Sequence, residues 1–225
     1  MNKKKKFWDF DTVVKTFDDH ISKSVPGYIE CQNLASDISV FFVKNKSIVY
    51  DVGCSTGTFT KLVYEKNNDK KINSFAYDIS EKMIKYAKYR KSKIKFIKKD
   101  ITTINFKKSD FISSMYTIQF LHPKDRQDLI NRIYKSLNWG GAFILFEKIR
   151  GKDARFQDLL NFLLFDYKKK NKISSKDILS KEKSLRGIME PFTLKQNMSY
   201  LKNAGFKDYM TIYQNINFVG ILAIK

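Results

Sequence analysis

The sequence predicts an α/β protein built on a mostly parallel sheet of seven strands with helices on both faces. From residue 47 onward, five short apolar runs alternate with stretches of helical periodicity. Several of these runs end in a carboxylate where the chain turns toward a helix. Residues 206–225 then alternate like a β-hairpin, which supplies two more strands. A strand–helix alternation of this kind is typical of a parallel, doubly wound sheet.

The apolar runs and the helical stretches follow one another in a regular order. The expected strands are 47–51, 72–78, 95–97, 110–115 and 142–146, followed by the hairpin strands 209–213 and 217–224. The expected helices between them are 58–66, 80–90 and 123–137. Ser80 is placed to cap the second helix, because its hydroxyl can accept a backbone N–H of the first turn. The Asn-Trp-Gly-Gly sequence at 138–141 is expected to terminate the third helix.

Two segments outside this alternation are predicted to be helical. They are an N-terminal part, at about 7–44, and an inserted segment, at about 151–190. The insert has a lysine-rich centre at 168–172. Its apolar positions, which we expect to be buried or to face a second subunit, are Phe156, Leu159, Leu160, Phe162, Leu163 and Leu164. No repeat or flexible linker interrupts the 225 residues, so we expect a single domain over 1–225.

The composition restricts the class of protein. The chain holds 43 Lys and Arg against 23 Asp and Glu, a net charge of +20. Such a charge makes a nucleic-acid partner, tRNA included, one possibility. Most of the cations are lysine, however, whereas nucleic-acid readers lean on arginine, so we favour a solvated basic surface.

The apolar runs, the N-terminal stretch and the cysteines indicate the compartment of the protein and whether it binds a metal. No apolar run is long enough to cross a membrane, and the basic start at 1–6 is not followed by the apolar stretch of a secretion signal. The two cysteines, Cys31 and Cys54, have neither disulfide-framework nor zinc-site spacing. We therefore expect a cytoplasmic protein without a bound metal.

The segment Val-Tyr-Asp-Val-Gly-Cys-Ser-Thr-Gly at 49–57 is the most informative in the chain. It ends the first strand with Asp51 and opens a helix through Gly53 and Gly57. Glycine allows a tight turn and a close approach of the backbone to a ligand. The spacing Gly-x-x-x-Gly is not the dinucleotide fingerprint, which is G-x-G-x-x-G.

Acidic residues also follow the next two strands. Asp78 ends the second strand, where a carboxylate can accept both hydroxyls of a ribose. Asp100 and Ile101 follow the third strand, where they can contact an adenine. Each carboxylate alone reads as an ordinary strand end or helix cap. Together with the glycine loop they indicate a binding site for S-adenosylmethionine (SAM) or S-adenosylhomocysteine (SAH).

Four further sequence motifs point to one family among the proteins that bind SAM. The chain contains Phe-Asp-Asp-His-Ile-Ser-Lys-Ser-Val-Pro-Gly-Tyr at 17–28, Gly-Cys-Ser at 53–55, Thr-Ile-Gln-Phe-Leu at 117–121 and Phe-Glu-Lys at 146–148. This combination resembles the carboxy-S-adenosylmethionine (carboxy-SAM) synthases of the tRNA wobble-uridine pathway. The resemblance runs over nearly the whole chain and implies a Rossmann-like class I methyltransferase fold. It also implies a homodimer in which the insert of one subunit reaches the site of the other.

Carried over by position, the resemblance assigns a set of residues to the cofactor: Tyr28, Gly53, Cys54, Ser55, Asp78, Ile79, Asp100 and Ile101. The chain departs from the family at two places. Met115 stands where the family has an asparagine that contacts the cofactor. Glu182 stands where the family has the arginine that binds the extra carboxylate of carboxy-SAM. The nearby cations that are candidates to replace it are Lys181 or Lys183, after a one-residue shift of the alignment, and Arg186.

Four functions follow from these observations. The leading one is a SAM-dependent methyltransferase that acts on a small acceptor, for which an anion is one option. The second is carboxy-SAM synthesis from SAM and prephenate, the third is tRNA methylation, and the fourth is a SAM-binding dimer without catalytic activity. The lysine-rich insert either attracts an anionic acceptor or, as we favour, forms a solvated face.

No dedicated catalytic residue is assigned, because alignment of the acceptor with the methyl group can supply much of the rate. His20 is a candidate general base, since an imidazole titrates near neutral pH, although a packing role is an equal alternative. Tyr116 and Gln119 follow the fourth strand and are candidates for acceptor contacts or for packing. Cys54 is expected to be a small packing residue in the glycine loop.

Overall fold

The computed structural model describes residues 14–89 and 93–225, which form one seven-stranded sheet in the order β3-β2-β1-β4-β5-β7-β6. The strands are β1 (Ile48–Val52), β2 (Asn73–Asp78), β3 (Lys95–Lys98), β4 (Ser109–Met115), β5 (Leu137–Lys148), β6 (Asp208–Asn215) and β7 (Phe218–Ile224). The pairings from β3 through to β5 are parallel, and β7 runs antiparallel to both β5 and β6. The predicted fold class is confirmed.

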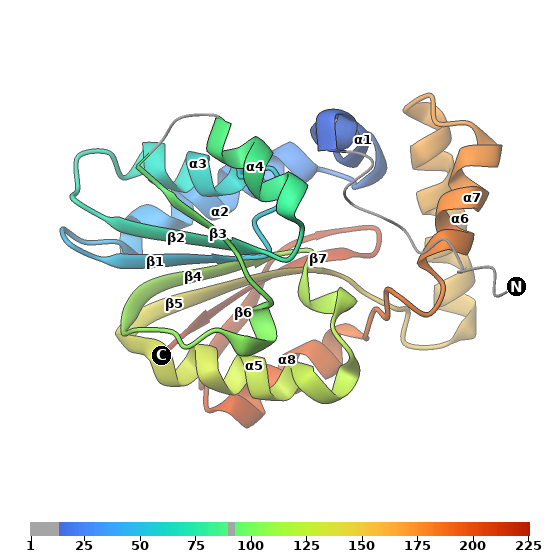
Figure 1. Ribbon diagram of the computed structural model, residues 1–225. Coiled ribbons are helices and arrows are strands. Elements are labelled where there is room, and N and C mark those ends of the chain that lie inside the picture. Colours follow the sequence, from blue (N-terminus) through green and yellow to red (C-terminus); the bar gives the residue numbers. More distant parts are fainter. Residues whose placement is uncertain (1–13, 90–92) are drawn as a thin grey trace, which may run out of the picture.

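Helices cover both faces of this sheet (Figure 1). The α-helices are α1 (Phe17–Ser24), α2 (Tyr28–Phe42), α3 (Thr58–Lys66), α4 (Glu81–Tyr89), α5 (Pro123–Ser136), α6 (Ala154–Lys170), α7 (Ser175–Leu185) and α8 (Leu194–Ala204). The described residues also form short 3-10 helices, namely η2 (Val14–Thr16), η3 (Ile101–Thr103) and η4 (Ile118–Phe120). In the view of Figure 1, α2, α3 and α4 lie above the sheet, and α5 and α8 lie below it.

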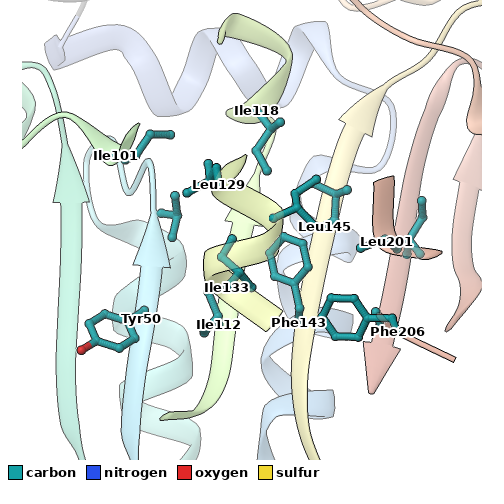
Figure 2. Close-up of a cluster of buried hydrophobic side chains, with 14 of the residues drawn as sticks. Tyr50, Ile101, Ile112, Ile118, Leu129, Ile133, Phe143, Leu145, Leu201 and Phe206 are labelled. Carbon is teal, nitrogen blue, oxygen red and sulfur yellow. The ribbon is translucent and has the colours of Figure 1, made fainter. Parts of the chain in front are cut away.

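The main core lies between the sheet and the helices α5 and α8 (Figure 2). Ile112 on β4 and Phe143 on β5 contribute fully buried side chains, and Leu129 and Ile133 meet them from α5. Burying one such side chain contributes roughly 1.5–3 kcal/mol. This packing fixes β4 and β5 and hence the loops that leave their carboxyl ends.

Residues 138–141 do not form the helix-terminating turn that we expected. The helix α5 already ends at Ser136, and β5 begins at Leu137. The register between β4 and β5 shifts between Ser109 and Phe111, so the residues from 138 to 141 form the extra length of β5 there. Gly140 N donates to the Lys225 carbonyl, and Lys225 N donates to that of Gly141, which ties this extra length to the C-terminus. The two glycines therefore lie in an irregular part of β5 and do not end the preceding helix.

The N-terminal part and the insert are helical as predicted. Residues 7–13 of the expected N-terminal helix, the basic start at 1–6 and Arg90 of the expected second helix lie outside the described residues. The insert forms α6 and α7, which stand as a pair beside the sheet near α1 (Figure 1). Of its apolar positions, Leu164 is buried, whereas Leu159 and Phe162 are more than half exposed on this single chain.

Ser80 caps α4 as predicted, since its Oγ accepts the N–H of Met83 at 3.1 Å. Within the described part of the chain, none of the helices is both long and apolar enough to span a bilayer.

Candidate functional site

A cavity of about 330 Å³ opens at the carboxyl ends of the central strands, between α1 and the inserted helices. This volume lies in the range of small-molecule sites. Asp51 from β1, Asp78 from β2 and Asp100 after β3 all line it. The three carboxylates that the sequence singled out therefore surround one hollow, as the parallel sheet requires.

The loop between β1 and α3 forms the floor of this cavity, and its shape depends on Gly53. This residue has φ +87°, and a Cβ placed on it would clash with the side chain of Thr117. The N–H groups of Gly53 and Cys54 both donate to the carbonyl of Tyr77, at 2.8 and 2.9 Å. The loop is thus pinned to the end of β2 in a conformation that favours glycine.

Asp78 connects the glycine loop to the helix α4. Its Oδ2 accepts the N–H of Ser55 and its Oδ1 accepts the N–H of Ser80, both at 2.8 Å. These bonds fix the orientation of the carboxylate at the cavity. A carboxylate oriented in this way can also accept hydroxyl donors from a ribose.

Asp100 and Ile101 lie beyond the next strand. Asp100 caps η3, because its Oδ1 accepts the N–H and the hydroxyl of Thr102, each at 2.8 Å. Ile79, which is 66% exposed, lines the cavity beside the buried Ile101. The two isoleucines offer apolar surface for a planar ring next to a carboxylate.

Asp51 differs from the other two carboxylates because it is almost completely buried. It accepts hydrogen bonds from the hydroxyls of Thr60 and Ser113. Burial raises the pKa of Asp51 to about 6, against the lowering effect of these two donors. Asp51 therefore holds α3 and β4 together beneath the glycine loop as well as lining the cavity.

Aromatic and apolar side chains form another wall of the cavity. Tyr28, at the start of α2, lies 6.1 Å from Tyr116, measured between ring centroids. The hydroxyl of Tyr116 donates to Cys31 Sγ at 3.4 Å, and Met115 precedes Tyr116 at the end of β4. All but Cys31 line the cavity. Cys54 is buried and packs in a small apolar cluster, which fits the expected packing role.

Gln119 lines the cavity, but its side-chain amide forms hydrogen bonds with backbone groups. Its Nε2 donates to the Tyr116 carbonyl at 3.4 Å, and its Oε1 accepts the N–H of Lys148 at 2.8 Å. Glu147 accepts the N–H of Ile118 at 3.0 Å, and burial raises the pKa of this carboxyl to about 8. Arg126 donates to the Gln119 carbonyl at 3.1 Å. This network sets the path of the chain after β4, where a reacting group would sit.

Basic side chains gather at the end of the cavity formed by β5 and the insert. Lys148, Lys168 and Lys181 line it there, with His20 from α1. Burial lowers the pKa of Lys148 to about 8 and that of Lys181 to about 7. Burial, and then the charges of Lys181 and Lys168, lower the pKa of His20 as well. Lys168 and Lys181 therefore differ from the solvated lysine face that we favoured for the insert.

Three sequence candidates lie away from this lining. Lys183 and Arg186 are exposed and are not brought to the cavity of their own chain, because Lys183 lies on another side of α7 and Arg186 follows its last turn. Glu182 is also exposed, and its Oε1 lies 3.7 Å from Lys168 Nζ. The insert also lines the cavity of its own chain, whereas the resemblance implied that it reaches the partner's site.

Sequence reasoning missed two parts of the site. Lys148 sits in the Phe-Glu-Lys motif, yet nothing local marks it as buried. Asp18 on α1 accepts hydrogen bonds from Thr56 at 2.6 Å and from Thr58 at 3.1 Å, and so closes α1 onto the glycine loop. The sequence shows an acidic residue in the motif at 17–28 and two threonines in the loop. It does not show that they are in contact, because only the fold brings these two segments together.

Comparisons with known proteins agree with this geometry. The family described as Methyltransferase domain matches residues 49–141, which span β1 to the start of β5. The carboxy-S-adenosyl-L-methionine synthase of Staphylococcus epidermidis is 37% identical over 224 residues, with 97% of each chain covered. That of Shewanella oneidensis is 36% identical, with 97% of this chain and 93% of the relative covered.

The chain belongs to the carboxy-S-adenosyl-L-methionine synthase family. Among solved structures, phosphoethanolamine N-methyltransferase 2 of Haemonchus contortus, in complex with S-adenosylhomocysteine, superposes with a TM-score of 0.69 at 17% identity. The match covers 98% of this chain and 59% of that longer one. It supports the fold, while the family assignment supports a SAM-dependent transferase.

Proposed function

We propose that this protein is a carboxy-SAM synthase that converts SAM and prephenate into carboxy-SAM. In this reaction the methyl carbon of SAM loses a proton and gains the ring carboxylate of prephenate, which aromatises with loss of hydroxide to phenylpyruvate, and the proton and hydroxide leave as water. The observation that carries the proposal is a cavity with carboxylates at the β1–β3 side and lysines at the β5 side, in a chain similar over its full length to synthases of that name. A cationic sulfonium bound beside a dianionic carboxylate donor matches this distribution of charge.

The residues around the β1–β3 side fit SAM. Asp78 would accept the ribose hydroxyls, Ile79 and Ile101 would flank the adenine, and the loop from Gly53 to Ser55 would approach the methionine portion. Tyr28 and Met115 would border the sulfonium. When bound, SAM supplies an activated methyl group, and the chain's part is to orient that group and to exclude water.

A second candidate is methyl transfer from SAM to a small anionic acceptor. It is favoured by Glu182, which by the resemblance stands at the position of the arginine that binds the extra carboxylate, and which offers no bidentate donor there. In this case the same lysines would hold the acceptor, and SAM would leave as SAH.

The oligomer that we propose is a homodimer built on α6. Phe156, Leu159 and Leu163 lie on one face of this helix at helical spacing, with Phe162 beside them 72% exposed. An apolar face of this kind on a single chain marks an interaction surface. Because Cys31 and Cys54 are both free, we further propose that the dimer acts in a reducing compartment such as the cytoplasm.

The proposed reaction is tested by incubating the purified protein with SAM and prephenate and measuring the products by mass spectrometry. We expect a product heavier than SAM by one carboxylate, dependent on prephenate. Formation of SAH with an added anionic acceptor, and no carboxylated product, would instead establish methyl transfer.

A further inference from the structure

The cavity is polarised along the order of the strands. Asp78 and Asp100 lie at the ends of β2 and β3, and Asp51 is on the adjacent β1. Lys148 ends β5, which lies on the other side of β4. Neighbouring strands are about 4.8 Å apart, so β2 and β5, which are three positions apart, are separated by about 14 Å. The strand-end carboxylates and the lysine of β5 therefore lie toward different ends of the cavity.

Three elements bring lysines to the positive end. Lys148 comes from β5, Lys168 from α6 and Lys181 from α7, and all three line the same cavity. Lys168 is only 9% exposed, and its positive charge acts on both of the other lysines. The insert therefore contributes two of the three cations, and the sheet contributes the third.

Burying several ammonium groups near one another is costly. Each loses hydration and is repelled by the others, unless a negative charge compensates them. In the described part of the chain, two carboxylates lie close to them: Glu182, 3.7 Å from Lys168, and Asp177, which lines the cavity and accepts the Ser174 hydroxyl at 2.6 Å. Glu182 is about half exposed, so solvent weakens its compensation. The arrangement suits an additional anion in the cavity.

We propose that Lys148, Lys168 and Lys181 form a subsite for a small dicarboxylate, which they hold facing the sulfonium end of bound SAM. The proposal rests on the proposed function and names the residues that replace the family arginine in this chain. Three ammonium groups on separate elements can bind two carboxylates without the forked geometry of a guanidinium. All three lysines belong to the same chain.

One alternative is that these lysines bind the carboxylate of SAM itself. The two ligands are distinguished by SAH, which keeps that carboxylate but brings no second anion. If the lysines serve the dicarboxylate, their loss leaves SAH binding intact. If they serve SAM, SAH binding falls together with substrate binding.

The experiment uses three single variants: Lys148→Met, Lys168→Met and Lys181→Met. Methionine preserves length and apolar volume while it removes the charge. Matched controls are Lys169→Met on α6 and Lys176→Met on α7, which are exposed neighbours of the cavity lysines on the same helices. Isothermal calorimetry measures SAH binding, and then prephenate and malonate binding to the SAH complex. Melting temperature confirms that each variant folds.

We expect each cavity variant to weaken prephenate and malonate binding at least tenfold and to change the SAH dissociation constant less than twofold. The controls should match the wild type in both. Equal losses for SAH and dicarboxylates, unchanged dicarboxylate binding in the cavity variants, or absence of dicarboxylate binding in the wild type would each overturn the subsite.

Measuring turnover shows whether the lysine subsite or the proposed function is at fault when one of them fails. If the wild type makes carboxy-SAM and the lysine variants keep its KM for prephenate, the subsite is wrong and the function stands. If no carboxy-SAM forms but the lysine variants still lose dicarboxylate binding, the subsite stands and the proposed reaction is wrong.

Discussion

Gly53 shapes the cavity floor by a steric requirement that a single substitution can test. In Gly53→Ala the new Cβ would meet the side chain of Thr117, in a backbone conformation that already disfavours alanine. We expect SAH affinity to fall at least tenfold in calorimetry. Gly140→Ala is the matched control, because Gly140 also has positive φ but has open space around it. Equal SAH affinity in both variants would contradict this account of the loop.

The raised pKa of the buried Glu147 carboxyl should make the stability of the protein depend on pH. Burial raises the pKa of this carboxyl from 4.5 to about 8, so its contribution to stability is complete below about pH 4.5 and is lost as pH rises toward 8. Glu147→Gln removes this titration and retains an acceptor for the Ile118 N–H. We therefore expect the variant to gain stability relative to the wild type between pH 5 and 8, as measured by urea unfolding. A difference that is constant with pH would refute the assignment.

Among the elements, α1 is tied to the glycine loop by the carboxylate of Asp18. Replacing Asp18 by alanine removes its bonds to Thr56 and Thr58, and hydrogen bonds to a charged group contribute about 1.5–3 kcal/mol each when buried. We expect faster hydrogen exchange over residues 17–24 and SAH binding weaker by about tenfold. Asp19→Ala is the control, since Asp19 is exposed and pairs with Lys23. Equal exchange in the two variants would show that α1 is held by other contacts.

The elements also show what the sequence can and cannot predict. The strands and the helices α3, α4 and α5 were predictable because hydrophobic periodicity and capping residues act locally. The early start of β5 at Leu137 was not, because its first residues pair with the distant C-terminal Lys225. The residues of the site also divide into predictable and unpredictable ones. Asp78 was predictable because it lies at the end of a strand. The burial of Lys148 and Lys168 was not, because it depends on how the insert packs on the sheet.

For the whole molecule, the exposed apolar face of α6 predicts the oligomeric state. We expect the wild type to be a dimer in light scattering coupled to size exclusion, and Phe162→Asp to be a monomer, because a charge would be buried at the interface. Trp139→Asp is the control, since Trp139 is 88% exposed but lies near the start of β5, at the opposite end of that strand from the insert. A wild-type monomer, or a dimer that survives Phe162→Asp, would contradict this interface.

At this scale we infer that one polarised cavity holds an adenosyl sulfonium at its carboxylate side and an anion at its lysine side. A crystal structure of the protein with SAH and malonate measures this directly. We expect ribose hydroxyls within hydrogen-bonding distance of Asp78 and a malonate carboxylate on Lys148, Lys168 or Lys181. A nucleoside bound away from Asp78, or malonate bound away from all three lysines, would contradict it.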